Sequence, residues 1–237
     1  MTYNNIQPAI FISRPNRFIA HCEVQGQEVV VHVKNTGRCK ELLIPGVTVY
    51  LEYHDNPKRK TNYSLIAVQK GERLINMDSQ VTNKMCYEAL HSGHLKLPDM
   101  PEPFTLIKGE QTYKKSRFDI YIQAGEAEAF VEVKGVTLEE DGVVRFPDAP
   151  TERGIKHIYE LVDAVKEGYK AYILFVIQMR NVKYFTPNDI THKAFGEALL
   201  YAKSQGVHIL AYDSVVEPDG IELNEEVRVI LDNDYGL

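Results

Sequence analysis

Residues 171–179, AYILFVIQM, carry apolar side chains at nearly every position. A strand that is apolar on both faces is typical of a parallel strand buried within a sheet whose two faces are covered. The surrounding chain contains both strand patterns and helix patterns. Strands are expected at 104–108, 117–122, 128–135 and 207–212, and helices at 148–168 and about 190–204. This order predicts a mixed α/β sheet flanked by helices for the second part of the chain.

The first part of the chain has short strand patterns and no long helix. Strands are expected at 17–24, 28–33, 47–53, 62–69 and 73–77, with Gln25-Gly26-Gln27 as a hairpin turn. Several short strands in so few residues favour a small β-barrel of the oligonucleotide-binding (OB) type.

The junction between the two parts contains a helix and a proline-rich connector. A helix is expected at 79–91, ended by Gly93, and LPDMPEP at 97–103 is typical of a linker. We therefore expect two domains, an OB-like barrel at 1–80 and a second domain at 81–237, with the boundary between 78 and 103.

The composition argues against a membrane protein and against a protein held together by zinc or disulfides. No apolar run approaches the roughly 20 residues of a membrane helix. Cys22, Cys39 and Cys86 are scattered without a C-x-x-C pair, which indicates reduced core thiols rather than a zinc site or a disulfide framework. We expect a cytoplasmic protein with no membrane partner, and leave its oligomeric state open.

The charges are distributed unevenly along the chain. Residues 1–100 hold 12 Lys and Arg against 9 Asp and Glu, whereas residues 101–237 hold 15 against 24. One interpretation is a front domain that binds a polyanion and a rear domain that holds a cation. The other is chance variation between two solvated surfaces.

Three charged residues interrupt the expected strands of the second domain. Asp119 lies in RFDIYI, and Glu132 and Lys134 lie in EAFVEVKG. Because alternate residues of a strand face opposite sides, Glu132 and Lys134 share one face. A hairpin through Gly125 would place that face beside the face that carries Asp119.

Two carboxylates about 4 Å apart repel by roughly 4 kcal/mol at an effective dielectric constant near 20. Lys134 offsets part of this repulsion if the group is a half-buried ion pair. The alternative is a divalent cation, because Mg²⁺ binds one or two carboxylates and keeps waters or phosphate oxygens as its other ligands. In that case Lys134 would orient water or stabilise charge on a phosphate.

The arrangement of Asp119, Glu132 and Lys134 resembles the PD-(D/E)XK nuclease motif. Longer stretches resemble the sugar fermentation stimulation protein A (SfsA) family over almost the whole chain: VHVKNTGRCKELLIPGVTVYLEY, DNPKRKTNY, SRFDIYI, FVEVKGVTL, FPDAPTERGIKHIYEL and GVHILAY. FPDA-x-TERG-x-KH is the most specific of these blocks.

This resemblance implies an N-terminal OB-like β-barrel and a C-terminal PD-(D/E)XK nuclease-like domain, a mixed sheet flanked by helices. It also implies DNA binding linked to the regulation of sugar (maltose) metabolism. The chain departs from the family pattern at Lys114, where a glycine is expected after Tyr113. That difference affects a turn and none of the three charged positions.

Three further residues have two interpretations each. Glu88, on the helix at 79–91, would be a third metal ligand or an exposed glutamate. Glu110 matches a family position or pairs with Arg117. His157, on the helix at 148–168, would order a metal-bound water or belong to a solvated polar stripe.

Basic residues predicted to contact nucleic acid fall into a barrel group and a helix group. They are Arg38, Lys40, Lys58, Arg59 and Lys60 in the barrel, and Arg153 and Lys156 on the helix at 148–168. OB barrels bind single strands with such basic loops, although a short basic run is often only a solvated surface.

The leading hypothesis is a DNA-binding protein with a Mg²⁺- or Mn²⁺-dependent phosphodiesterase site. Asp119 and Glu132 would hold the metal, and Lys134 would position the attacking water or the scissile phosphate. One alternative is a transcriptional regulator that binds single- or double-stranded DNA without cutting it. Another is an RNA-processing nuclease, because an OB barrel accepts either polymer.

Overall fold

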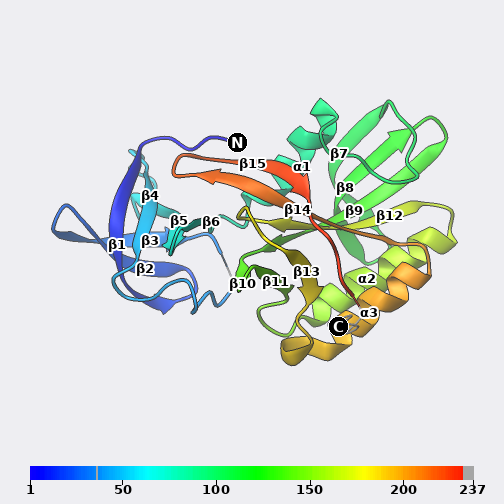
Figure 1. The fold of residues 1–237 in the computed structure, drawn as a ribbon. Coiled ribbons are helices and arrows are strands. Elements are labelled where there is room, and N and C mark those ends of the chain that lie inside the picture. The colour runs from blue at the N-terminus through cyan, green and yellow to red at the C-terminus, as the bar shows by residue number, and fades with distance from the viewer. Residues whose placement is uncertain (36, 232–237) are drawn as a thin grey trace.

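The computed structural model describes residues 1–35 and 37–231 (Figure 1). Its N-terminal part is a closed barrel of five strands, β1 (Ile6–Asn16), β2 (Ile19–Val24), β3 (Gln27–Val33), β4 (Thr48–Tyr53) and β5 (Tyr63–Lys70). The strand order is β3-β2-β1-β4-β5, and β3 pairs in parallel with β5 to close the ring. This is the expected OB-like barrel.

The barrel differs from the expectation in one strand at each end. β1 was not predicted, because Pro8 and Pro15 and the irregular pairing around Ser13 hide its alternation. The predicted strand at 73–77 is β6 (Arg73–Asn76), which pairs with β5 in that sheet and lies outside the closed ring.

The C-terminal part is built on a six-stranded mixed sheet of order β15-β14-β12-β9-β8-β7. The strands are β7 (Leu106–Tyr113), β8 (Ser116–Ala124), β9 (Ala127–Val136), β12 (Lys170–Ile177), β14 (His208–Glu217) and β15 (Gly220–Glu226). β12 runs parallel to both β9 and β14, and its residues from Ala171 to Ile177 are all buried. The prediction of a buried parallel strand is therefore confirmed.

Helices cover both faces of this sheet. α1 (Val81–Ser92) packs on the face that carries Leu174 and Val176, and α2 (Glu152–Lys166) packs on the face that carries Ile173 and Phe175. α3 (Asp189–Ser204) lies beside α2, as Figure 1 shows. The alternation of successive β12 side chains between the two layers explains why this strand is apolar throughout.

The helix boundaries follow local chemistry. α1 ends at Gly93, which has a left-handed φ of 73°, as expected. α2 begins later than the predicted residue 148, because the side chain of Thr151 caps it by accepting a hydrogen bond from the backbone N–H of Gly154 at 3.1 Å. Asp148 instead accepts a hydrogen bond from the backbone N–H of Arg38 in the barrel.

A small third sheet, which was not predicted, joins the two parts. It contains β10 (Leu138–Glu140), β11 (Val143–Phe146) and β13 (Tyr184–Pro187). Glu139 on β10 is buried and forms ion pairs with Lys70 at 2.7 Å and Arg73 at 2.6 Å, both from the β5–β6 hairpin. Strands of three or four residues are too short to show a clear period in the sequence.

Candidate functional site

The antiparallel hairpin of β8 and β9 brings the three motif residues together. Its register pairs Ile120 with Val131, so that the next position along places Asp119 opposite Glu132. The ladder of paired residues ends at Ile120, and beyond it Asp119 Oδ2 accepts the backbone N–H of Val133 at 2.8 Å. The carboxylate of Asp119 thus takes a backbone donor of the neighbouring strand.

Asp119 is also held from α1. The side chain of Asn83 donates a hydrogen bond from Nδ2 to Asp119 Oδ1 at 2.7 Å. Burial, followed by the nearby charge of Glu132, raises the pKa of Asp119 above its usual range. Asn83 was not identified from the sequence. The side chain that α1 contributes here is an amide, rather than the acid of Glu88 that the sequence suggested.

The two carboxylate oxygens of Glu132 have different surroundings. Oε1 accepts hydrogen bonds from His157 Nδ1, at 2.5 Å, and from Lys134 Nζ. Oε2 is buried and has no hydrogen-bond partner among the described residues. Burial alone would raise the pKa of Glu132, but the hydrogen bond from His157 and the charge of Lys134 outweigh it and lower that pKa.

α2 supplies the support for Glu132. Arg153 Nε donates to His157 Nε2 at 3.4 Å, so Nε2 acts as the acceptor and Nδ1 carries the hydrogen that is donated to Glu132. His157 is buried, with 6 % of its surface exposed. It therefore contacts Glu132 rather than belonging to a solvated stripe.

Glu88 does not join this group. Its carboxylate lies 3.5 Å from the amino group of Met1 and 3.8 Å from Lys84, and it is half exposed. Five positions separate it from Asn83, which corresponds to about 140° around a helix of 3.6 residues per turn. The helix face that points to Asp119 therefore does not carry Glu88.

Glu110 lies near the site but faces solvent. Gly109 pairs with Ile120 and Gln111 with Phe118, so Glu110 stands opposite Asp119 in the register of β7 and β8. Its backbone adopts a left-handed φ of 54°, which is uncommon for a non-glycine residue. Its side chain lies 3.4 Å from Arg117, and both side chains are well exposed.

The chemistry of the donors at Asp119 and Glu132 determines which metal ion they could hold. The described residues contain no group of three or more His, Cys, Asp or Glu side chains that could enclose a metal. Asp119 and Glu132 supply two carboxylates, which is the number that Mg²⁺ takes from a protein when water and phosphate complete its shell. The buried, unpartnered Oε2 of Glu132 provides the free ligand atom, so these residues fit a hard divalent cation.

The predicted basic residues lie in three places. Lys58 and Lys60 are exposed in the β4–β5 loop, where Arg59 is held by Ser64 Oγ at 2.8 Å. On α2, Arg153 reaches His157, while Lys156 donates to the carbonyl of Lys115. Arg38 and Lys40 lie on the β3–β4 connection.

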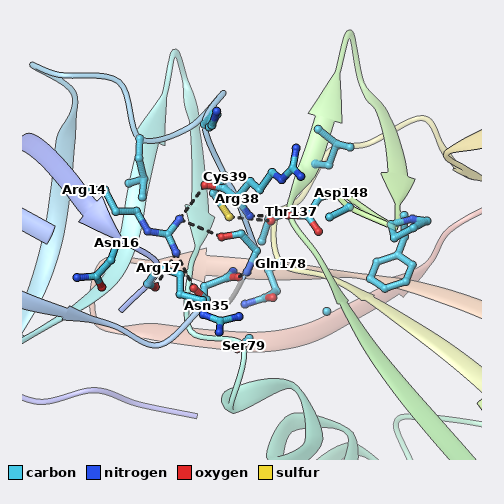
Figure 2. Close-up of a pocket in the computed structure, with 18 of the residues that line it drawn as sticks. Arg14, Asn16, Arg17, Asn35, Arg38, Cys39, Ser79, Thr137, Asp148 and Gln178 are labelled. Atoms are coloured by element: carbon cyan, nitrogen blue, oxygen red, sulfur yellow. Dashed lines mark hydrogen bonds between the residues drawn. The ribbon is translucent and has the colours of Figure 1, made fainter. Parts of the chain in front are cut away.

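A cleft of about 920 Å³ separates the barrel from the third sheet and the start of α2, and Figure 2 shows it in close-up. Arg38 and Lys40 line it. Arg14, Arg17 and Arg145 also line it and were missed. The segment SRPNR, residues 13–17, was a signal for two of them, because it places Arg14 near the end of β1 and Arg17 in the turn that follows.

Two family models and several known proteins match this chain over nearly its whole length. Residues 80–220 match the family described as "Sugar fermentation stimulation protein RE domain", and residues 12–77 match the "SfsA N-terminal OB domain". A sugar fermentation stimulation protein homolog of Clostridium beijerinckii is 59% identical, with 98% of this chain and 100% of that protein covered. One of Desulfitobacterium hafniense is 58% identical, with 98% and 99% covered.

A solved structure extends the comparison to the fold. The structure of Pyrococcus furiosus SfsA in complex with Ca²⁺ has a TM-score of 0.87 at 29% identity, with 97% of this chain and 98% of that chain covered.

Proposed function

The chain belongs to the sugar fermentation stimulation protein A (SfsA) family, and we propose that it binds DNA and hydrolyses phosphodiester bonds at a Mg²⁺ or Mn²⁺ site. Asp119 and Glu132 are the proposed metal ligands, and Lys134 is the proposed cationic catalytic residue. We further propose that this activity serves the regulation of sugar (maltose) metabolism in the cytoplasm.

One observation carries the proposal. Glu132 is 3% exposed, and its Oε2 has no hydrogen-bond partner within the part of the chain that the structure describes. A buried carboxylate oxygen without a partner loses the free energy of its solvation, a cost that a bound cation would offset. The second carboxylate, on Asp119, accepts the backbone N–H of Val133, the residue next to Glu132, and this proximity supports a site for two-carboxylate coordination.

The side chains around the metal have separate roles in the proposal. A divalent cation at this site would polarise a phosphate oxygen and lower the pKa of a bound water. Asn83 and the Val133 N–H orient Asp119, and His157 orients Glu132. Lys134 places a positive charge beside the carboxylates, where it would stabilise the negative charge that develops on a phosphate.

The solved relative supports the choice of cation. Ca²⁺, named with Pyrococcus furiosus SfsA, is a hard ion that binds oxygen ligands, as Mg²⁺ does. The donors present here are carboxylate oxygens, and the three cysteines are buried and unpaired with one another. This chemistry favours Mg²⁺ or Mn²⁺ over a thiolate-bound metal.

A second candidate function is DNA binding without cleavage. It is favoured by the ion pair between Lys134 and Glu132, which compensates part of the buried charge without any metal. In that case the protein would act as a regulator that uses a nuclease-like fold only to hold DNA. An RNA substrate at the same site is the third candidate, because OB barrels bind either polymer.

One experiment separates these candidates. The protein is incubated with end-labelled single- and double-stranded DNA and RNA in the presence of Mg²⁺, Mn²⁺ or EDTA. We expect cleavage of DNA that requires metal and is abolished by EDTA. Binding of DNA without any metal-dependent cleavage would support the regulator, and preferential cleavage of RNA would support the RNA-processing enzyme.

Among the described residues, none of the helices has the length and apolar character of a membrane span. Cys22, Cys39 and Cys86 are all buried free thiols, which is consistent with the reducing cytoplasm proposed as its location.

A further inference from the structure

The cleft between the barrel and the third sheet is strongly basic in an acidic protein. The whole chain has a formal net charge of −6. The cleft lining nevertheless includes five basic residues, Arg14, Arg17, Arg38, Lys40 and Arg145, against a single acidic residue, Asp148. Like charges gathered in a confined space repel each other, so this lining favours an anionic ligand.

Arg14 has a structural role in this lining. Its guanidinium donates to the backbone carbonyls of Arg17, Asn35, Gly37 and Arg38, at distances of 2.7 to 3.0 Å. These bonds fix the β3–β4 connection against the β1–β2 turn, as the dashed lines in Figure 2 show. The backbone at Gly37 and Arg38 is therefore held by Arg14 without any ligand.

The other basic side chains are largely uncompensated. Within residues 1–35 and 37–231, Arg17, Arg38 and Lys40 form no ion pair, and Arg145 lies 3.6 Å from Glu140, which is 80% exposed. Asp148 accepts the backbone N–H of Arg38 at 2.8 Å, and among the described residues it forms no ion pair with these cations. Four positive side chains are thus available to a ligand in the cleft.

The cleft leads to the proposed metal site. Gly135, the residue that follows Lys134 on β9, lies in its lining, as does Thr137. Thr151, which caps α2, lies in the lining too, and the same helix carries Arg153 and His157. A polyanion in the cleft would therefore extend between the barrel and the strand that bears Glu132 and Lys134.

We propose that this cleft is the binding path for a single polynucleotide strand, whose phosphates are held by Arg17, Arg38, Lys40 and Arg145. This inference rests on the proposed function, since it assigns a substrate form to that site. The volume of about 920 Å³ lies within the range of roughly 300–1,000 Å³ typical of small-ligand pockets, which suits a few nucleotides of one strand. OB barrels commonly bind one strand in a basic groove.

Binding without cleavage tests the path. Fluorescence anisotropy is measured in EDTA, with a labelled single-stranded oligothymidylate and with a duplex of the same length, over a series of salt concentrations. We expect the wild type to favour the single strand. The Arg38→Ala/Lys40→Ala variant should bind at least tenfold more weakly at low salt. Its slope of log affinity against log salt should fall by about 1.4, or roughly 0.7 for each phosphate that the variant no longer neutralises.

The matched control removes two lysines from α3. Lys193 and Lys203 are exposed and lie outside the cleft lining, so Lys193→Ala/Lys203→Ala should keep the wild-type salt slope. Circular dichroism melting checks that both double variants are folded. Equal slopes for the wild type and the Arg38→Ala/Lys40→Ala variant would overturn the proposal.

Three other results would also overturn it. A Lys58→Ala/Lys60→Ala variant that alone flattens the slope would place the strand on the β4–β5 loop. Tighter binding of the duplex would exclude a single-strand path. Displacement of the oligonucleotide by inorganic phosphate at micromolar concentration would indicate a site for a free anion. Because EDTA is present throughout, the absence of cleavage activity would leave this test unaffected.

Discussion

Glu132 concentrates the chemistry of the site in one side chain. Oε1 is held by His157 and Lys134, whereas Oε2 is buried and unpartnered among the described residues. Such an asymmetric arrangement leaves one oxygen of a fixed carboxylate for a ligand outside the chain. The residues that contact Glu132 therefore determine both its orientation and its charge.

Removal of Lys134 tests its catalytic role. Lys134→Ala should lower the rate of metal-dependent cleavage by about 100-fold or more, because removal of one preorganised charge-stabilising donor commonly costs that much. DNA affinity should change by only a few-fold, since a single phosphate contact contributes little to binding. Single-turnover cleavage and anisotropy measure the two quantities. Lys108→Ala, an exposed lysine on β7, is the control, and equal rates for both variants would contradict the assignment.

His157 is expected to act through Glu132. His157→Ala should weaken the binding of Mn²⁺ or Ca²⁺ by roughly 10- to 100-fold, the usual cost of losing a residue that orients a metal ligand. His157→Asn should retain part of the affinity, because the amide nitrogen of Asn can replace Nδ1 as a donor. Titration calorimetry measures the metal directly, with Lys166→Ala on the same helix as the control. Unchanged affinity in His157→Ala would show that Glu132 needs no such support.

At the scale of elements, α2 connects the cleft with the proposed metal site. Its N-cap Thr151 lines the cleft, and its buried face carries His157 toward Glu132. The start of the helix at Glu152 sets the rotation at which His157 faces the sheet. A substitution of the N-cap Thr151 therefore affects the first turns of α2, which carry His157.

The cap of α2 can be tested by itself. Thr151→Ala removes the acceptor of the Gly154 N–H and should destabilise the protein by about 1 kcal/mol. Thr151→Ser keeps a hydroxyl oxygen at the same place and should restore most of that loss. Urea unfolding monitored by circular dichroism gives the free energy of unfolding for both variants. A Thr151→Ala variant as stable as the wild type would show that water caps the helix equally well.

At the scale of the whole molecule, Glu139 connects the barrel to the C-terminal part. It is buried on β10 and pairs with Lys70 and Arg73, while its Oε1 also accepts the backbone N–H of Gly142 at 2.5 Å. Burial raises the pKa of Glu139, but the bonds from Lys70, Gly142 and Arg73 outweigh it and lower the pKa to about 2. The ionised form is therefore stabilised by folding.

The lowered pKa predicts how stability depends on pH. A carboxyl with a depressed folded-state pKa contributes stability above its unfolded pKa of about 4.3, and that contribution is lost as pH falls toward 2. Glu139→Gln should cost about 3 kcal/mol at pH 7, and less than half of that near pH 3. Urea unfolding at the two pH values measures the difference. Glu102→Gln, which removes an exposed partner of Lys96, should change stability little at either pH.

Several elements followed from local patterns in the sequence. Period-two alternation and a glycine turn are properties of neighbouring residues, so the hairpin of β8 and β9 was predicted. The shared face predicted for the three charged residues is not what their contacts show, because Asp119 bonds to Asn83 of α1 whereas Glu132 bonds to His157 of α2. The unbroken apolar run of β12 indicated its burial in the same way. The barrel was predicted as a class, although β1 was missed, because prolines and irregular pairing disturb its alternation.

By itself, the sequence determined the secondary elements with a clear period, the class of both folded parts and the three charged positions on one hairpin. The tertiary structure decided which distant residues meet them: Asn83 at Asp119, His157 at Glu132, and Arg14 beneath the loop that carries Arg38. It also decided that Glu88 points elsewhere. The physical reason is that periodicity reports on residues a few positions apart, whereas these contacts depend on how helices and loops pack across the sheet and the barrel.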